Sequence, residues 1–128
     1  MMISLIVLGA AAAAQTGMSN CQTATTQQEM NWCAAEDFAR TEAQMNLQFE
    51  ATTRQLRERD AQWNQPLDKR PGHLTSLLLS QRGWKQYRDA QCQAEALRFR
   101  GGSIEPYVTA SCKARLTRQR IGELRALT

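Results

Sequence analysis

One stretch decides the fold: Thr26 to Trp63 reads TQQEMNWCAAEDFARTEAQMNLQFEATTRQLRERDAQW, without a glycine or a proline. Its first four residues match a capping box, in which Thr26 and Glu29 each accept a hydrogen bond from the other's backbone amide at the start of a helix. Apolar residues then recur at spacings of 7, 4, 7 and 7 residues, and Thr52 divides the third of these spacings into steps of three and four. Such spacings match the 3.6-residue period of an α-helix, so these residues lie on one face. These residues are Phe38, Met45, Phe49, Leu56 and Trp63. The stretch predicts one helix of about 35 residues.

The rest of the chain predicts two further helices, separated by glycine and proline. Gln62–Gly72 is a polar connection that contains two of the three prolines. We expect the second helix over Leu74–Phe99, ended by Gly101 and Gly102, because glycine supplies the left-handed backbone of a C-cap. The third helix should follow Pro106, which suits a first turn. The expected inner face of the second helix carries Leu74, Leu77, Leu78, Gln81, Trp84, Arg88 and Cys92, with Tyr87 beside it. The apolar positions of the third are Val108, Cys112, Leu116, Ile121 and Leu124.

The composition argues against a sheet core. Beyond residue 14 the 128-residue chain contains only three Val and Ile residues, too few for strands to pack on. A chain of this length builds one domain. We therefore predict an all-α fold, a small bundle of one long helix packed on a disulfide-tied helical hairpin, as a single domain over residues 15–128.

The first 14 residues, MMISLIVLGAAAAA, form an uncharged apolar run that ends in small residues. This pattern predicts a secretory signal peptide with cleavage after Ala14. The run is too short for a membrane span, which takes about 20 residues, although an uncleaved interfacial anchor is an alternative. The mature protein is expected to be periplasmic or secreted, and to meet the membrane only transiently through its signal peptide.

Four cysteines in a short exported chain indicate two disulfides. Three pairings are possible, and spacing favours the two local ones. Cys92 and Cys112 lie ten residues before and after Gly102, so a hairpin that turns there brings them level. Cys21 can fold back beside Cys33, which lies about two turns inside the first helix. Neither a Cys-x-x-Cys motif nor a histidine pair is present, so we expect no metal and no cofactor.

Candidate catalytic residues are sparse. The single histidine, His73, lies at a loop–helix junction and is expected to be a capping or surface residue. The acidic residues Glu36, Asp37, Glu58 and Asp60 belong to a polar helical face, where carboxylates are normally solvated rather than paired for acid–base catalysis. Ser103 follows two glycines but lacks the strand–turn–helix context of a nucleophile elbow. We therefore predict that the protein is not an enzyme.

Charge differs between the two halves of this chain of net charge +4. Gln15–Gln65 carries −3 and Arg82–Thr128 carries +6, so helices of opposite sign can pack favourably. Alternatively, four C-terminal arginines could bind an anionic polymer or surface: Arg115, Arg118, Arg120 and Arg125. Nucleic acid is not expected as a partner, because the chain is exported and no aromatic residues interleave with these arginines.

Three features of the second helix have a structural interpretation. Trp84 and Tyr87 lie at helical spacing and are expected to be core residues. Arg88 and Asp89, next to Cys92, predict a buried arginine–carboxylate pair that fixes the register of the helices.

The motifs resemble those of the LprI-like lysozyme-inhibitor family over about residues 21–124. The resemblance rests on three blocks: Cys21…Thr26-Gln27-x-Glu29-Met30-Asn31-x-Cys33-Ala34 with Met45-Asn46-x-x-Phe49; Gln81-Arg82-x-Trp84-x-x-Tyr87-Arg88-Asp89-Ala90-x-Cys92-x-x-Glu95; and Gly101-Gly102-Ser103-Ile104-x-Pro106 with Cys112-x-x-x-Leu116-Thr117-x-x-Arg120. It implies a small, helical, disulfide-containing domain of the cell envelope, with a lysozyme as a possible partner.

Two functions follow as hypotheses. The first is a secreted or periplasmic binding protein that inhibits a lysozyme-type glycosidase by blocking its cleft. The alternative is a non-catalytic envelope module that binds another envelope protein or an anionic polymer. The candidate binding element is the turn Gly101-Gly102-Ser103, whose backbone groups can imitate sugar hydrogen bonding. The competing interpretation of the same turn is a helix C-cap.

Overall fold

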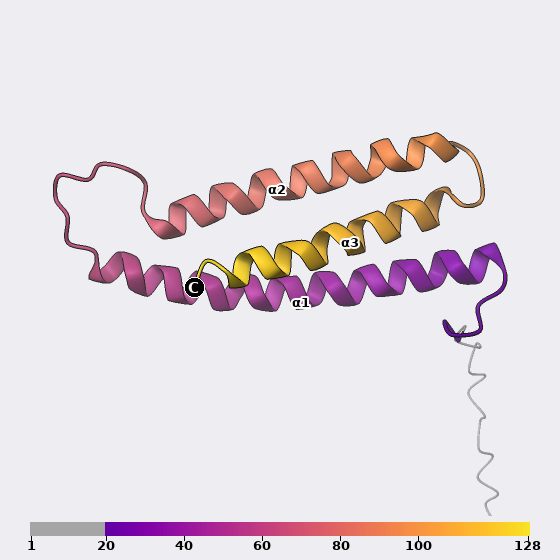
Figure 1. Ribbon diagram of the computed structural model, residues 1–128, viewed down its shortest axis with the longest axis horizontal. Helices are drawn as coiled ribbons and strands as arrows, with labels where there is room; N and C mark the ends of the chain where they lie inside the picture. The colour runs from indigo at the N-terminus through magenta and orange to yellow at the C-terminus, as the bar shows by residue number, and fades with distance from the viewer. Residues whose placement is uncertain (1–19) are drawn as a thin grey trace, which may run out of the picture.

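The computed structural model describes residues 20–128 and consists there of three long helices (Figure 1). These are α1 (Gln27–Gln62), α2 (His73–Ala96) and α3 (Glu105–Arg125), with a short 3-10 helix, η1 (Leu97–Phe99), at the end of α2. α2 runs back along α1, and α3 returns parallel to α1 and lies between the two (Figure 1). The described chain contains no strand. The predicted all-α bundle, with one long helix against a helical hairpin, is confirmed.

The capping box at the start of α1 is present as predicted. The Thr26 hydroxyl accepts a hydrogen bond from the Glu29 amide at 3.2 Å, and the Glu29 carboxylate accepts one from the Thr26 amide at 3.1 Å. A second backbone amide, that of Thr25, donates to the same carboxylate at 2.9 Å. These amides, Thr25 first and then Thr26, lower the pKa of Glu29. The negative charge is thereby kept at the positive end of the helix dipole.

α2 is capped by a residue from another helix. Its N-cap residue, Gly72, has no side chain, and the carboxylate of Asp60 accepts instead from the amides of His73 (2.8 Å) and Leu74 (2.9 Å). A Cβ atom at Gly72 would lie 2.9 Å from an Asp60 carboxylate oxygen. A larger residue at this position would press on the Asp60 carboxylate that caps α2, so glycine leaves room for this cap.

The core runs along the seam between the three helices. Its largest cluster consists of Met45 and Leu56 from α1, Leu77 from α2 and Leu124 from α3. Phe49, Trp84 and Ile121 pack against this cluster and are partly buried. The second cluster contains Cys92, Cys112 and Leu116, so a disulfide is part of the core at that end.

Both expected disulfide pairings are present. Cys92–Cys112 joins α2 to α3, with Cα atoms 5.4 Å apart. Cys21–Cys33 ties the segment before α1 back to that helix, with Cα atoms 5.6 Å apart. The described residues contain no free cysteine. The hairpin is therefore cross-linked close to its turn, on the side where α1 begins (Figure 1).

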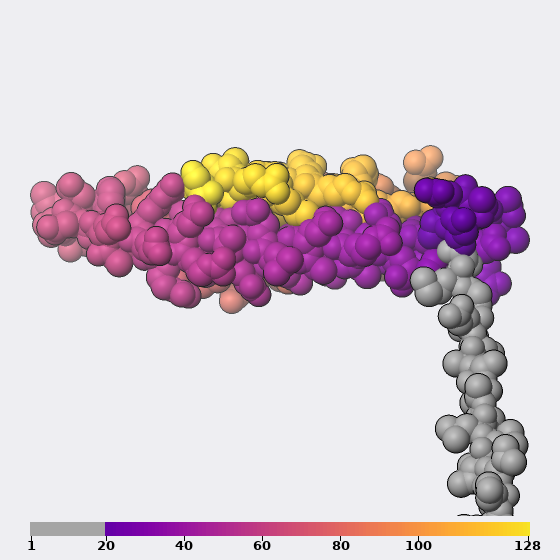
Figure 2. Space-filling view, turned by 90° about the horizontal axis from the view of Figure 1, so that it is seen from below, coloured from indigo at the N-terminus to yellow at the C-terminus, as the bar shows by residue number. Residues whose placement is uncertain are grey.

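α3 is too short to reach the other end of the bundle. The space-filling view shows α1 covering its face from end to end, while α3 lies along one edge and stops before the α1–α2 connection (Figure 2). The last turn of α3 lies beside residues 52–59 of α1, where Thr52 donates to the Leu124 carbonyl at 3.1 Å and Arg59 donates to the Leu127 carbonyl at 2.8 Å. Beyond this point only two helices remain.

Three predicted inward residues are instead exposed. Trp63 is 55% exposed because it follows α1 beyond the end of α3, where no third helix covers it. Leu78 is 46% exposed and Tyr87 is 56% exposed, because their neighbours Leu77 and Arg88 hold the inward positions of α2. The prediction that Tyr87 is a core residue is wrong.

No helix among residues 20–128 is both long and apolar enough to cross a membrane. The predicted signal peptide, residues 1–14, lies outside the described residues.

Candidate functional site

The α2–α3 turn projects from the disulfide-bearing end of the bundle. Gly101 has φ +76°, a left-handed conformation that favours glycine, as the predicted C-cap requires. Its amide donates to the Glu105 carboxylate at 2.7 Å, and the Gly102 amide donates to the Phe99 carbonyl at 2.9 Å. Glu105 thus holds the turn from the first residue of α3. The turn is an ordered structure with its own hydrogen bonds.

The turn is also fixed to α1. The side-chain amide of Asn31 donates to the Ser103 carbonyl at 2.8 Å, across 72 positions of sequence. The Ser103 side chain remains exposed. The amides of Gly101 and Gly102 and the Ser103 carbonyl already form hydrogen bonds within the protein. A partner would therefore contact side chains at the turn more than free backbone groups. This differs from the expected imitation of a sugar by the backbone.

Exposed aromatic and apolar side chains gather at this end. Phe99 is 40% exposed beside the turn, and three further side chains of the same end are exposed to a similar degree: Trp32, Leu97 and Tyr107. Two arginines, Arg98 and Arg100, flank Phe99 in the sequence. The sequence-based prediction missed this group, although the run Arg-Phe-Arg before two glycines is a visible signal.

The charged groups around the turn differ in whether they form hydrogen bonds or ion pairs. Glu95 accepts hydrogen bonds from Gln91 at 3.1 Å and from Arg115 at 3.0 Å. The Gln91 hydrogen bond, followed by Arg115 and Arg98, lowers the pKa of Glu95. Within residues 20–128 the guanidinium of Arg100 has neither a hydrogen bond nor an ion pair. Arg100 is therefore a free cation beside an ordered turn.

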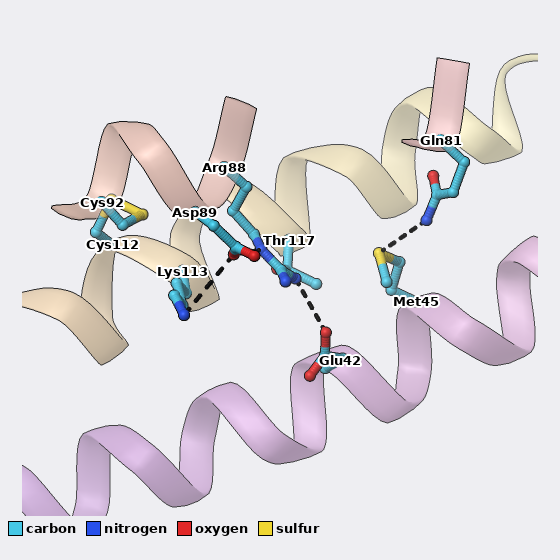
Figure 3. Close-up of polar contacts among 9 residues, drawn as sticks. All are labelled: Glu42, Met45, Gln81, Arg88, Asp89, Cys92, Cys112, Lys113 and Thr117. Atoms are coloured by element: carbon cyan, nitrogen blue, oxygen red, sulfur yellow. Dashed lines mark hydrogen bonds and ion pairs between the residues drawn. A yellow bond between two sulfur atoms is a disulfide. The ribbon is translucent and has the colours of Figure 1, made fainter. Parts of the chain in front are cut away.

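The most buried cation belongs to the sequence block around Trp84. Arg88 is 5% exposed and lies with its guanidinium 5.1 Å from the Trp84 ring and 5.2 Å from the Phe38 ring. It donates to Asp89 at 2.9 Å and to Glu42 on α1 at 3.1 Å (Figure 3). Arg88 thus links α2 to α1 through a charge-assisted hydrogen bond.

The expected register pair therefore needs a correction. Asp89 is the next residue on the same helix, and its side chain is about half exposed, so the Arg88–Asp89 pair lies within α2 and does not itself join two helices. The groups that Arg88 reaches across the bundle are the carboxylate of Glu42 and the hydroxyl of Thr117, at 3.3 Å (Figure 3). Lys113 on α3 approaches Asp89 at 3.7 Å.

A second arginine lies on the other side of Trp84. Arg120 is buried, with its guanidinium 5.7 Å from the Trp84 ring. It donates to Gln81 at 3.0 Å and to Ser80 at 2.6 Å, and it pairs with Glu123 at 3.1 Å. The Gln81 amide in turn contacts the Met45 sulfur at 3.5 Å (Figure 3). Trp84 is thus held between two cations.

Three of the four arginines proposed to bind an anionic partner make contacts within the bundle. Arg120 is buried, Arg115 pairs with Glu95, and Arg118 pairs with Asp37 on α1. Only Arg125 among these four has no ion pair in the described chain. The opposite charges of the two halves are used for contacts within the bundle.

A pocket of about 930 Å³ occupies the opposite end, where α3 is missing. Leu56, Leu77 and Leu127 contribute its apolar lining. Its polar lining is provided by Asp60, Asp68, Arg70, His73, Ser76 and Ser80, with Trp63 and Pro71 at the α1–α2 connection. The volume lies in the range of ligand pockets.

The ionisable groups around this pocket contact one another in pairs. Arg70 binds Asp68 through two hydrogen bonds of 2.9 and 2.7 Å, and these, with the Arg70 amide, lower the pKa of Asp68 to about 2. Nδ1 of His73 lies 2.9 Å from Asp60 and the imidazole packs edge-on against Trp63, which fits the expected capping or surface role. The described residues contain no cluster of three or more His, Cys, Asp or Glu side chains suited to a metal.

Comparison with known proteins places the chain in a family. The family model described as lysozyme inhibitor LprI matches residues 17–124. An uncharacterised protein of Rhizobium meliloti (strain 1021) is 35% identical over 130 residues, which cover 96% of this chain and 88% of that protein. No solved structure matches. The expected resemblance is confirmed, and the chain belongs to the LprI lysozyme-inhibitor family.

Proposed function

We propose that the mature protein, residues 15–128, is a periplasmic or secreted inhibitor that covers the cleft of a lysozyme-type glycosidase. Family membership supports a non-catalytic inhibitory role, and two disulfides fit an oxidising compartment. The observation that carries the proposal is the disulfide-bearing end of the bundle. It exposes Trp32, Phe99 and Tyr107 together with a free arginine, and aromatic residues and arginine dominate the binding energy of protein interfaces.

The same end is rigid before it binds. The Cys92–Cys112 disulfide, the Gly101–Glu105 hydrogen bond and the Asn31–Ser103 hydrogen bond all restrain the α2–α3 turn. A restrained surface loses little conformational entropy when it docks, and this favours affinity. We therefore propose Gly101, Gly102 and Ser103 as the part of the surface that enters the cleft.

The test measures muramidase turnover on cell-wall substrate with purified mature protein and several classes of lysozyme. We expect the wild type to inhibit at least one class, and Ser103→Arg to weaken that inhibition by steric obstruction. Ser76→Arg is the matched control, because Ser76 lines the pocket at the opposite end of the bundle. Melting curves of both variants verify folding.

The outcomes separate the activity from its location. Absence of inhibition by the wild type across all classes would contradict the proposed function. Inhibition that survives Ser103→Arg but is lost in Ser76→Arg would keep the function and place the interface at the pocket.

The alternative function, an envelope module that binds another envelope protein, is favoured by one observation. Three large side chains of α2, Leu78, Leu79 and Tyr87, are exposed to solvent at different positions around the helix. Exposed apolar groups of this kind can mark a protein interface. Two results together would support this function. The wild type would inhibit none of the lysozymes, and it would form a complex with an identified envelope protein that Leu79→Asp does not form.

A further inference from the structure

We propose that Arg100 is the residue that pairs with the catalytic carboxylates of the inhibited glycosidase, with Phe99 packed beside it in the cleft. This inference rests on the proposed function and assigns the recognition of the enzyme to named side chains. It requires a cation that is free, that lies on a rigid projection, and that is not bound by the acidic groups near it.

Lysozyme-type glycosidases offer a distinctive electrostatic target. They cleave a glycosidic bond between two carboxyl groups, and in retaining enzymes these groups are only about 5–5.5 Å apart. The cleft therefore attracts a cation even when the enzyme as a whole is basic. A guanidinium can donate hydrogen bonds to both oxygens of a carboxylate, which a lysine cannot match in geometry.

Arg100 fits this target by its position. It directly precedes Gly101 in the turn, and its amide donates to the Leu97 carbonyl at 3.3 Å, so its backbone is held by η1. The residue is exposed, and its guanidinium has no partner among residues 20–128. Phe99, its neighbour, is half-exposed and can fill an apolar subsite that normally holds a sugar ring.

The nearby acidic groups are already engaged. Glu105 accepts the Gly101 amide, and Glu95 accepts hydrogen bonds from Gln91 and Arg115. Neither of them binds Arg100. The guanidinium therefore has no ion pair to break when it meets the carboxylates of a partner, and only its hydration is lost.

This local contact also accounts for how a basic chain can bind a basic enzyme. The net charge of +4 gives no long-range attraction to such a partner, but a single arginine in a desolvated cleft acts at short range. Binding then depends on which residue carries the charge and much less on the total charge. That distinction can be tested directly.

The experiment compares Arg100→Glu with Arg82→Glu. Both variants change the net charge by the same amount. Arg82 resembles Arg100 in being exposed and without an ion pair in the described chain, but it lies within α2 and not at the turn. We expect the inhibition constant to rise at least about tenfold for Arg100→Glu and to change little for Arg82→Glu. Arg100→Ala should also weaken inhibition, and Arg100→Lys should retain part of it because the charge remains.

A partner-side substitution completes the test. In a lysozyme whose catalytic acid is changed from Glu to Gln, the affinity for wild-type protein should fall, whereas the affinity for Arg100→Ala should not fall further. If wild type inhibits but Arg100→Glu and Arg82→Glu behave alike, the assignment of Arg100 is wrong and the proposed function stands. If wild type inhibits no lysozyme, the proposed function fails and the role of Arg100 fails with it.

Discussion

At the level of single residues, the carboxylate of Asp60 replaces the capping side chain that Gly72 lacks. The amides of Leu74 and His73 donate to it, and together with the His73 side chain they lower its pKa. A carboxyl group with a lowered pKa stabilises the fold above its unfolded pKa of about 3.9. That contribution is lost as the pH falls through the folded pKa.

We therefore expect Asp60→Asn to lower the melting temperature near neutral pH, because two amides of α2 lose a charged acceptor. The difference from wild type should shrink as the pH falls below the folded pKa of Asp60, where the wild-type carboxyl is also neutral. Glu58→Gln is the control, because this substitution removes the same charge from an exposed position of the same helix. A difference for Asp60→Asn that stays constant from about pH 7 to pH 2 would contradict this role.

Trp84 is the second residue whose role can be measured. It packs against the main core cluster, and Arg88 and Arg120 lie over its ring at 5.1 and 5.7 Å. We expect Trp84→Ala to reduce the free energy of unfolding by about 3 kcal/mol, at the low end for a large aromatic residue because Trp84 is only partly buried. Trp32→Ala, at an exposed position of α1, should have a much smaller effect. Equal urea midpoints for wild type and Trp84→Ala would contradict the packing described.

At the level of elements, the two disulfides are expected to contribute unequally. Cys92–Cys112 closes a loop with a sequence separation of 20 and joins two helices of the core. Its removal by paired serine substitutions should cost about 3 kcal/mol. Cys21–Cys33 restrains a segment that otherwise makes short-range turn contacts, such as the Thr23–Asn20 hydrogen bond, so its removal should cost less. Denaturation of both double variants checks this order, and a larger loss without Cys21–Cys33 would reverse it.

The elements themselves could be predicted because their signals are local. The capping box at Thr26, the glycines after η1 and the symmetric cysteines around Gly102 act over a few residues or across one hairpin. The side chains that bridge between helices could not be predicted in the same way. Asp60 caps α2 from 13 positions away, and Glu42 binds Arg88 across 46 positions. Such partners depend on how the helices are rotated against each other, which a periodic pattern leaves open.

The candidate site was predicted only in part for a related reason. Gly101, Gly102 and Ser103 were recognised from the turn that they form. Trp32 belongs to a different helix and is brought to that end by the bundle, through contacts such as the Asn31–Ser103 hydrogen bond. The pocket at the opposite end exists because α3, with 21 residues, is shorter than α1, with 36. The residues that line the pocket do not reveal this difference in helix length, so their sequence does not predict the pocket.

At the level of the whole molecule, the two ends of the bundle are built for different roles. The end with the α1–α2 connection is hollow because α3 stops early, and the ionisable side chains Asp60 and His73, and Asp68 and Arg70, contact each other there. The opposite end is cross-linked by disulfides and presents aromatic side chains with the free cation Arg100. A rigid end with unpaired groups is better suited to entering the cleft of an enzyme.

Competition with a cleft ligand tests this account most directly. The affinity of the mature protein for an inhibited lysozyme is measured by titration calorimetry, with and without a saturating chito-oligosaccharide that occupies the cleft. We predict that the saturating oligosaccharide weakens the apparent affinity strongly, because the disulfide-bearing end and the sugar compete for the same space. An affinity that is unchanged by the oligosaccharide would contradict the account, since the protein would then bind the enzyme outside its cleft.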